Sequence, residues 1–162
     1  MKTKLLFISI LLFGATSGMH AQSRLFEKLS NEKNITVVTI TKTLLKLMPQ
    51  KATDKMDMSG LEINHLMEKL DQIDIFVTED NSAMKTMRED VKVAFSSDKT
   101  FENIMKIKEK DSDVNFYVQR GNGEMIKSLV MFVNEKDEGI LIRLLGNFTA
   151  EDIQTVVSCM DM

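Results

Sequence analysis

Apolar residues recur along this chain with two spacings, and each spacing predicts a different kind of element. Intervals of three and four residues predict helices. Alternation, or a dense run of β-branched residues, predicts strands. In the first half of the chain the expected helices span residues 22–29, 42–48 and 60–70, and the expected strands span residues 34–41 and 73–77. Pro49, the only proline, ends the second of these helices.

The segment from residue 81 to residue 108 predicts two more helices. Asn81 or Ser82 is expected to cap the first one. Its apolar positions lie three or four residues apart, at Met84, Met87, Val91 and Ala94. Asp98 is expected to cap the second helix. One side of that helix would carry Phe101, Ile104, Met105 and Lys108.

The last third of the chain predicts a three-stranded antiparallel meander followed by one helix. The three strands and the helix are expected at residues 114–119, 125–133, 140–145 and 149–157. The sequence Gly121-Asn122-Gly123 supplies the first turn between strands. Thr149 and Asp152 form a variant of the capping box, which opens the final helix. The inner side of that helix is expected to carry Ile153, Val156 and Val157.

Together these elements predict a single α+β domain over residues 22–162. Its sheet is expected to be largely antiparallel, with about five strands and with helices packed mainly on one face. A chain of 162 residues, 43% hydrophobic and 28% charged, is long enough for one such core and has the composition of an ordinary globular protein.

The first 21 residues are typical of a secretory signal peptide. Lys2 and Lys4 precede a short apolar run, Leu5–Phe13, and small residues follow up to Ala21. The apolar run extends about 14 Å as a helix, at ~1.5 Å per residue, which is too short for a bilayer core of ~30 Å. We therefore expect cleavage near Ala21 and export to the periplasm, or secretion, without a membrane anchor.

The charge balance and the missing motifs argue against several functions. A formal net charge of −3, without a basic stripe, is a poor basis for binding nucleic acid. The sequence has no glycine-rich phosphate loop and no Gly-X-Ser-X-Gly motif. The acidic pairs Glu79–Asp80 and Glu109–Asp111 lie in charged turns, where a solvated surface is a simpler interpretation than acid–base catalysis.

Cys159 is the only cysteine, and His65 is the only histidine after the signal-like segment. A lone cysteine cannot form an internal disulfide, so Cys159 is expected to be buried, a passive thiol or paired with another molecule. One cysteine and one histidine also fall short of a zinc site. The sequence therefore predicts no catalytic residue, no cofactor and a function other than catalysis.

Methionine is unusually frequent, with 13 residues in the chain. Thioethers and thiolates are soft ligands that select Cu(I). The weak candidates for such a site are Met56, Met58, Cys159, Met160 and Met162. The alternative is that methionine fills irregular gaps in a core, and the helical spacing of Met84 and Met87 favours it.

Two expected strands of the meander are apolar on both faces. These are Ser128–Val133 and Ile140–Leu145, the second interrupted only by Arg143. A sheet with one solvated face should alternate instead. Either helices of the same chain cover both faces, or one face contacts a protein partner, a second copy of the chain or an apolar ligand. Tyr117, Lys127 and Arg143 could cluster across neighbouring strands as a polar interaction face.

Short segments spread over the chain carry a resemblance to a known family. They are Ser23–Lys28, Val38–Lys42, Val114–Tyr117, Leu141–Thr149 and Glu151–Ile153. Through them the sequence resembles the exported "domain of unknown function 4252" (DUF4252) family of Bacteroidetes. The resemblance covers nearly all of the chain after residue 21. It implies no established activity and no site residues, but it suggests a role in envelope signalling.

These observations favour a non-enzymatic exported protein that binds a protein partner in the cell envelope. One alternative is a carrier of an apolar small molecule or of Cu(I), which predicts an enclosed apolar cavity or converging methionine sulfurs. The other is a hydrolase, which predicts a pocket where His65 meets carboxylates.

Overall fold

The computed structural model describes residues 21–47 and 63–158. In chain order its elements are α1 (Ala21–Ser30), β1 (Thr36–Thr41), α2 (Lys42–Leu47), α4 (Ile63–Lys69), β2 (Leu70–Thr78), α5 (Asn81–Ser97), β3 (Phe101–Lys108), β4 (Ser112–Arg120), β5 (Ile126–Glu135), β6 (Gly139–Phe148) and α6 (Ala150–Ser158). Within these residues, no helix has the length and apolar character needed to cross a membrane.

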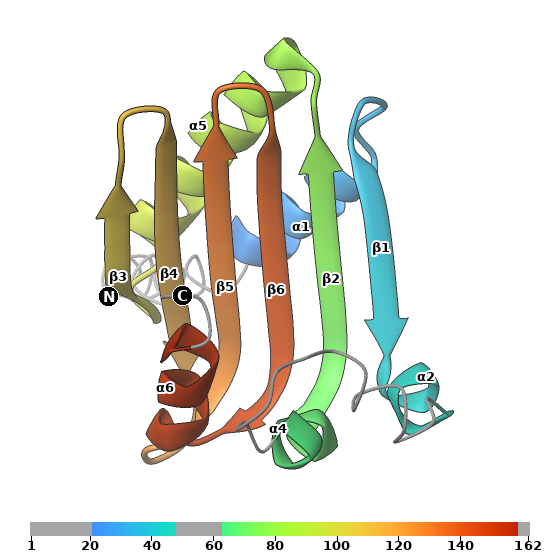
Figure 1. Ribbon diagram of the computed structural model, residues 1–162, viewed down its shortest axis with the longest axis vertical. Helices are drawn as coiled ribbons and strands as arrows, with labels where there is room; N and C mark the ends of the chain where they lie inside the picture. Colours follow the sequence, from blue (N-terminus) through green and yellow to red (C-terminus); the bar gives the residue numbers. More distant parts are fainter. Residues whose placement is uncertain (1–20, 48–62, 159–162) are drawn as a thin grey trace, which may run out of the picture.

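The strands form one six-stranded sheet with the order β1-β2-β6-β5-β4-β3, and every neighbouring pair is antiparallel (Figure 1). The predicted α+β class, the antiparallel sheet and the C-terminal meander of β4, β5 and β6 are confirmed. Short turns join the meander: the Gly121 amide donates to the Met125 carbonyl at 2.7 Å, and the Glu135 amide donates to the Glu138 carbonyl at 2.9 Å.

The sixth strand is β3, and the helix expected over residues 101–108 is wrong. β3 pairs with β4, but its register shifts between Asn103 and Met105. This β-bulge leaves Ile104 as an extra residue without an opposite partner, and Ile104 is exposed. One extra residue changes the spacing of apolar positions from two to three and four. That change made a bulged strand resemble an amphipathic helix.

Helix α5 begins one residue earlier than the sequence suggested. Asp80, not Asn81 or Ser82, is the N-cap, and its Oδ1 accepts a hydrogen bond from the Ala83 amide at 2.8 Å. At the other end the Asp98 amide donates to the Ala94 carbonyl. Asp98 therefore ends α5, where the sequence had suggested that it starts another helix.

Helices α1 and α5 pack on one face of the sheet, which we call the helix-covered face (Figure 1). The strands contribute Phe76, Val130, Phe132 and Leu141 to this core. The helices contribute Leu25, Phe26, Leu29, Ala83, Met87, Val91, Ala94 and Phe95. Met87 is fully buried and Met84 is nearly so, which is the gap-filling role expected for these two methionines.

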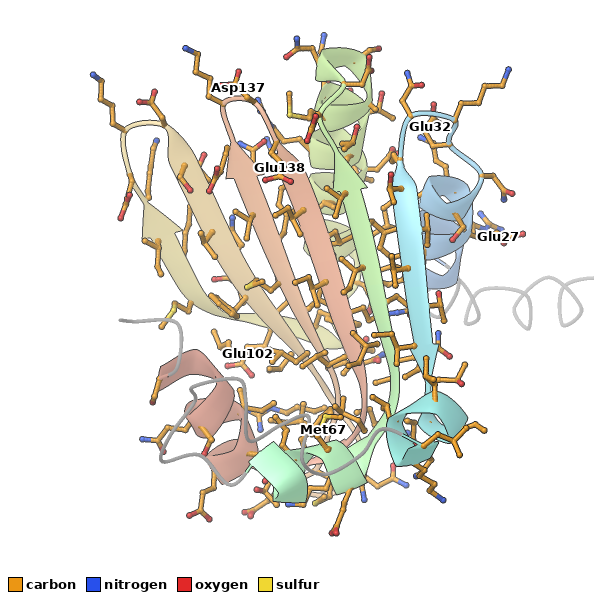
Figure 2. The ribbon with its side chains drawn as sticks, turned by 45° about the vertical axis from the view of Figure 1, so that its right-hand side comes forward. Glu27, Glu32, Met67, Glu102, Asp137 and Glu138 are labelled. Atoms are coloured by element: carbon orange, nitrogen blue, oxygen red, sulfur yellow. The ribbon has the colours of Figure 1, made fainter. Side chains whose placement is uncertain are left out.

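The opposite face, which we call the open face, is covered by helices at one end. There α2, α4 and α6 gather at the end of the sheet where β2 begins and β6 finishes (Figure 1). They pack over a second core that includes Leu45, Leu70, Leu129, Phe148 and Ile153. Figure 2 shows Met67 of α4 at this end and Asp137 and Glu138 at the other. Among the helices of the described residues, none covers the part of the open face near Glu138 (Figure 1).

Candidate interaction face

Arg143 lies on the helix-covered face, where it is held by a carboxylate and an aromatic ring. Its Nη2 and Nε donate to Asp74 Oδ2 at 2.6 and 2.9 Å, and its Cζ lies 3.8 Å from the Phe26 ring centroid. Gln72 Nε2 and Thr39 Oγ1 also donate to Asp74, at 2.8 Å each to Oδ1. Since Asp74 is 3% exposed, this network joins α1, β1, β2 and β6 inside the protein.

Tyr117 lies in the same row as Arg143, with Val130 between them. Its ring stacks on Phe95 of α5 with a centroid separation of 4.4 Å. Burial raises the pKa of the Tyr117 phenol, and a hydrogen bond with Asn103 partly offsets the rise. Lys127 is exposed and lies three residues from Val130 along β5. Its side chain packs next to Gly121. The structure thus places Tyr117 and Arg143 together beneath helices and Lys127 elsewhere.

On the open face, apolar side chains form rows that run across the strands; we call them the aliphatic rows, because all of their members except Phe116 are aliphatic or methionine. The first row lies nearest the end of the sheet at Glu138, which we call the free end. It comprises Val77, Ile140, Val133, Val114 and Ile107. The second row comprises Val38, Ile75, Ile142, Met131, Phe116 and Met105. The third row comprises Ile40, Ile73, Leu144, Leu129 and Val118. The strands β5 and β6 are apolar on both faces because they contribute to these rows on the open face and to the core on the helix-covered face.

The three rows differ in how well the protein covers them. The third row packs into the core beneath α2, α4 and α6. Among the described residues, Ile75, Val77, Ile140 and Ile142 belong to neither buried cluster and are partly exposed. Val38, at the edge of the second row, is 45% exposed. In the same two rows Phe116 is fully buried, and Met105, Val114 and Met131 pack against the second core. Within the described part of the chain, the uncovered aliphatic surface therefore consists of Val38, Ile75, Val77, Ile107, Val133, Ile140 and Ile142.

The size of this surface follows from ordinary sheet spacings. With strands ~4.8 Å apart and alternate residues ~6.8 Å apart, two rows over five to six strands span roughly 24 by 14 Å, and the uncovered aliphatic surface is a part of this span. The full span is about the size of the largest apolar patch on a monomeric protein, and such patches are often functional.

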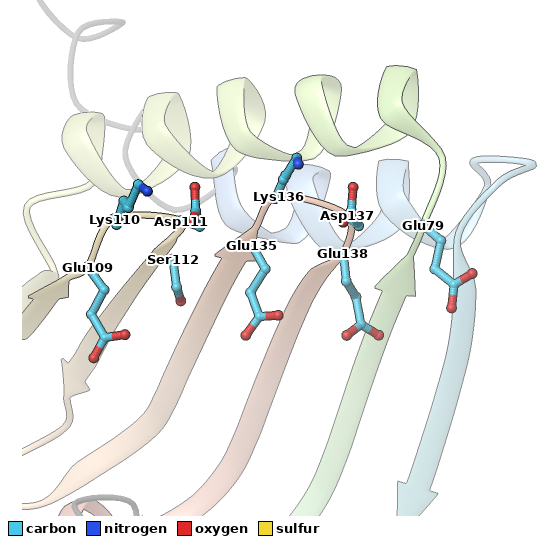
Figure 3. Close-up of a pocket in the computed structure, with 9 residues that line it drawn as sticks. All are labelled: Glu79, Glu109, Lys110, Asp111, Ser112, Glu135, Lys136, Asp137 and Glu138. Carbon is cyan, nitrogen blue, oxygen red and sulfur yellow. The ribbon is translucent and has the colours of Figure 1, made fainter.

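A row of acidic side chains borders this surface at its free end. Glu79, Glu109 and Glu135 each follow a first-row residue by two positions, and Glu138 precedes Ile140 by two. Alternation therefore places their side chains on the open face, next to Ser112. In Figure 3 these five side chains extend to one side, whereas Lys110, Asp111, Lys136 and Asp137 point away at the loop tips. Together these nine residues line a depression of about 750 Å³.

A second hollow, of about 480 Å³, lies on the helix-covered face between α5 and the strands β3 and β4. Arg88, Lys92 and Lys106 give it positive charge, and Tyr117 and Asp113 also line it. Asp113 Oδ1 is buried and has no hydrogen-bond partner among the described residues. Neither a histidine nor a cysteine is among its lining residues, so the hollow offers no familiar nucleophile–base pair.

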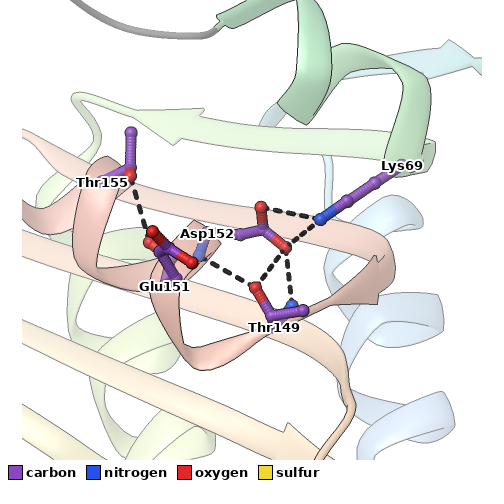
Figure 4. A network of polar contacts seen from close by, with 5 residues as sticks. All are labelled: Lys69, Thr149, Glu151, Asp152 and Thr155. Carbon is purple, nitrogen blue, oxygen red and sulfur yellow. Dashed lines mark hydrogen bonds and ion pairs between the residues drawn. The ribbon is translucent and has the colours of Figure 1, made fainter.

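Lys69, Thr149 and Asp152 form a polar network that fixes the covered end of the open face (Figure 4). Lys69 Nζ donates to Asp152 Oδ1 and Oδ2 at 2.9 and 2.6 Å. The Thr149 amide and hydroxyl donate to the same carboxylate, and the Asp152 amide donates back to Thr149 Oγ1. The reciprocal capping box expected from these two residues is present, and Lys69 ties it to α4.

Several sequence candidates fall outside what the structure describes. Residues 1–20 and all five candidate copper ligands (Met56, Met58, Cys159, Met160 and Met162) lie outside the described residues. His65 is in α4, but its side chain is not among those described. Within the described part of the chain, no group of three or more histidine, cysteine, aspartate or glutamate residues could hold a metal ion. The expectations about copper and His65 stay predictions.

The family comparison agrees with the resemblance seen in the sequence. The family model "Domain of unknown function (DUF4252)" matches residues 26–156, which is most of the chain. The chain belongs to the DUF4252 family. No curated protein and no solved structure matched the chain. The match covers all six strands of this DUF4252 protein, including the strand ends that carry the glutamate row.

The two-faced apolar strands are visible in the sequence, but the glutamate row is not. In the sequence Glu79 and Glu109 belong to charged turns, separate from the strands. The signal that could have found the row is the two-residue alternation of the strands, which continues for one more step beyond the strand end. Examples are Val77-Thr78-Glu79 and Ile107-Lys108-Glu109. Only the pairing of five strands brings these ends into one row.

Proposed function

We propose that this DUF4252 protein is a non-enzymatic binding protein that is exported to the cell envelope, where its open sheet face holds a protein partner. The observation that carries the proposal is the uncovered aliphatic surface, which is the part of the first two rows that the described residues leave partly exposed. Partly exposed aliphatic side chains contribute little to the stability of the isolated domain, but they favour association when a partner covers them.

Two features support a permanent docking surface over an incidental one. The sheet beneath the rows is rigidly supported, since α1 and α5 pack against its other face through fully buried residues such as Met87 and Leu141. The rows also run without interruption across neighbouring strands, from Val77 to Ile107. A sheet that is already packed on its other face loses little conformational entropy when a partner binds.

Photo-crosslinking in the producing cell tests the proposal. A benzophenone amino acid replaces Ile142 or Ile75 in one set of variants, and Val93 in a control variant. Val93 is an exposed apolar residue of α5, on the opposite side of the sheet. We expect the same discrete protein adduct from positions 142 and 75, identified by mass spectrometry, and no such adduct from position 93.

An adduct of equal yield from all three positions, or no adduct from positions 142 and 75, would contradict docking on the open face. Export is measured in the same cells. We expect the protein in the periplasmic or secreted fraction, with a mature N-terminus near Gln22. A full-length cytoplasmic protein would contradict the exported location.

A further inference from the structure

The glutamate row and the two aliphatic rows form one continuous surface with an apolar centre and an acidic edge. We propose that this surface takes a cationic amphipathic helix of a partner protein, with leucine-like side chains on the aliphatic rows and Lys or Arg side chains on Glu79, Glu109, Glu135 and Glu138. This inference rests on the proposed function and specifies the chemistry of the partner.

The positive charge of the partner follows from the unpaired carboxylates. None of the four glutamates forms an ion pair within the described residues. The two nearest lysines in the depression, Lys110 and Lys136, point away from the row (Figure 3). Like charges aligned along neighbouring strand ends repel one another, and a cationic partner relieves that repulsion while it fixes the direction of docking.

The helical form of the partner follows from the dimensions. The glutamate row crosses five adjacent strands and therefore extends about 19 Å at ~4.8 Å per strand. A helix of about 16 residues is ~24 Å long and ~10 Å wide, so it fits within the roughly 24 by 14 Å that the two aliphatic rows span. The same sheet already holds an amphipathic helix of similar length on its other face. This helix is α5, which has 17 residues and packs through Met87, Val91 and Phe95.

A second copy of the chain fits this surface less well. The two aliphatic rows offer at most roughly 340 Å² on ordinary sheet spacings, because some of their side chains are buried, whereas a specific interface usually buries about 800 Å² on each partner. α2, α4 and α6 also stand on the open face beside the aliphatic surface (Figure 1) and obstruct a flat sheet-to-sheet contact. A single partner helix needs no larger area than the one available.

The test uses the exported protein and two synthetic helical peptides of about 16 residues. Both peptides carry leucines on one face, and one carries lysines on the flank where the other carries glutamines. Methyl NMR reports the position of binding through the Ile75, Ile142 and Val77 signals. Calorimetry reports the affinity. The acidic edge is removed in the variant E79Q/E109Q/E135Q/E138Q.

The matched control variant is E27Q/E32Q/E89Q/E124Q, which changes the net charge by the same amount. These four glutamates are exposed and do not line the depression. Figure 2 places Glu27 and Glu32 away from Glu138, Glu89 lies on α5, and Glu124 precedes the end of β5 opposite Glu135. We expect the lysine peptide to shift the three methyl signals. We also expect it to bind the first variant about tenfold more weakly than the wild type, with little change in the control variant, because several exposed ion pairs are lost together only in the first.

Two results would overturn the inference. If the glutamine peptide binds the open face as tightly as the lysine peptide, or both variants lose affinity equally, the surface recognises apolar groups without its acidic edge. Cross-linking at Ile142 would then still support a docking face, so the proposed function would stand alone. If neither peptide shifts the methyl signals, the helix inference is wrong, and the cross-linking result decides the proposed function separately.

Discussion

Arg143 lies directly opposite Asp74 across the β2–β6 pair, and both of its donating nitrogens reach the same carboxylate oxygen, at 2.6 and 2.9 Å. The carboxylate is almost fully buried, so it depends on its partners for solvation. Removing one partner of a buried ion pair leaves an uncompensated charge. We therefore predict that Arg143→Ala lowers the free energy of unfolding by about 3 kcal/mol, measured by urea denaturation.

The control for this prediction is Arg120→Ala. Arg120 also pairs with a carboxylate, Glu102 Oε2, at 3.0 Å, but both side chains are exposed. Water solvates each charge when the other is removed, so the expected change is below about 1 kcal/mol. Equal losses in the two variants would mean that burial of Asp74 does not determine the contribution of its ion pair.

The capping carboxylate Asp152 predicts a stability change at acid pH. Burial alone would raise its pKa, but hydrogen bonds from Lys69 and Thr149 outweigh burial and hold the pKa below the ordinary value of 3.8. A group with a lowered pKa in the folded state stabilises that state above its unfolded pKa. The stabilisation is lost as the pH falls through the folded value.

We accordingly expect the free energy of unfolding to decrease as the pH falls below 3.8, and to decrease less in Asp152→Asn. At neutral pH the same variant is expected to be less stable by about 1–2 kcal/mol, because the cap of α6 and the Lys69 contact are weakened together. The matched variant is Asp71→Asn, because Asp71 forms an exposed pair with Lys42. In this variant the decrease of the free energy of unfolding at acid pH should be almost the same as in the wild type. An Asp152→Asn protein with the acid profile of the wild type would contradict the assignment.

The elements that were predicted correctly are those whose signal is local. The meander follows from alternation and from Gly121-Asn122-Gly123, and the α6 cap follows from two residues three positions apart. β3 was missed because a bulge changes the apolar period locally, and only its pairing with β4 reveals the strand. A bulge is stabilised by the neighbouring strand, so its information lies outside the segment.

The site shows the same division between local and non-local information. Apolarity on both faces of β5 and β6 is visible in the sequence, and it predicted an unusual surface. The glutamate row depends on the order β2-β6-β5-β4-β3, in which β6 lies between β2 and β5. This order places Glu79 next to Glu138 although 58 residues of chain separate them in the sequence. Contacts of such range cannot be read from spacing.

Gly146 makes a close approach that explains why a glycine stands near the end of β6. A Cβ at this position would overlap the Lys69 carbonyl oxygen and lie 2.7 Å from the Phe148 ring. Gly146→Ala should therefore destabilise the protein by about 1–3 kcal/mol, as overpacking of a tight contact usually does. Gly139→Ala is the control, because a Cβ there meets Met84 and Met87 only at ordinary contact distances of 3.4 and 3.6 Å. Thermal unfolding of both variants checks the difference, and similar midpoints would contradict it.

Ile142 and Leu141 are consecutive residues of β6 whose side chains point to opposite faces of the sheet, so they compare the two faces within one strand. Leu141 is fully buried under α1 and α5, and Leu141→Ala is expected to cost about 2–5 kcal/mol. Ile142 is partly exposed on the open face. Ile142→Thr keeps the β-branched shape that strands favour and places a hydroxyl where water reaches it, so we expect a loss below about 1 kcal/mol.

Urea denaturation of the isolated protein measures both values. If Ile142→Thr were as costly as Leu141→Ala, the protein itself would cover the open face. A small loss together with the disappearance of the cross-linked partner would show that these rows act in binding and contribute little to folding.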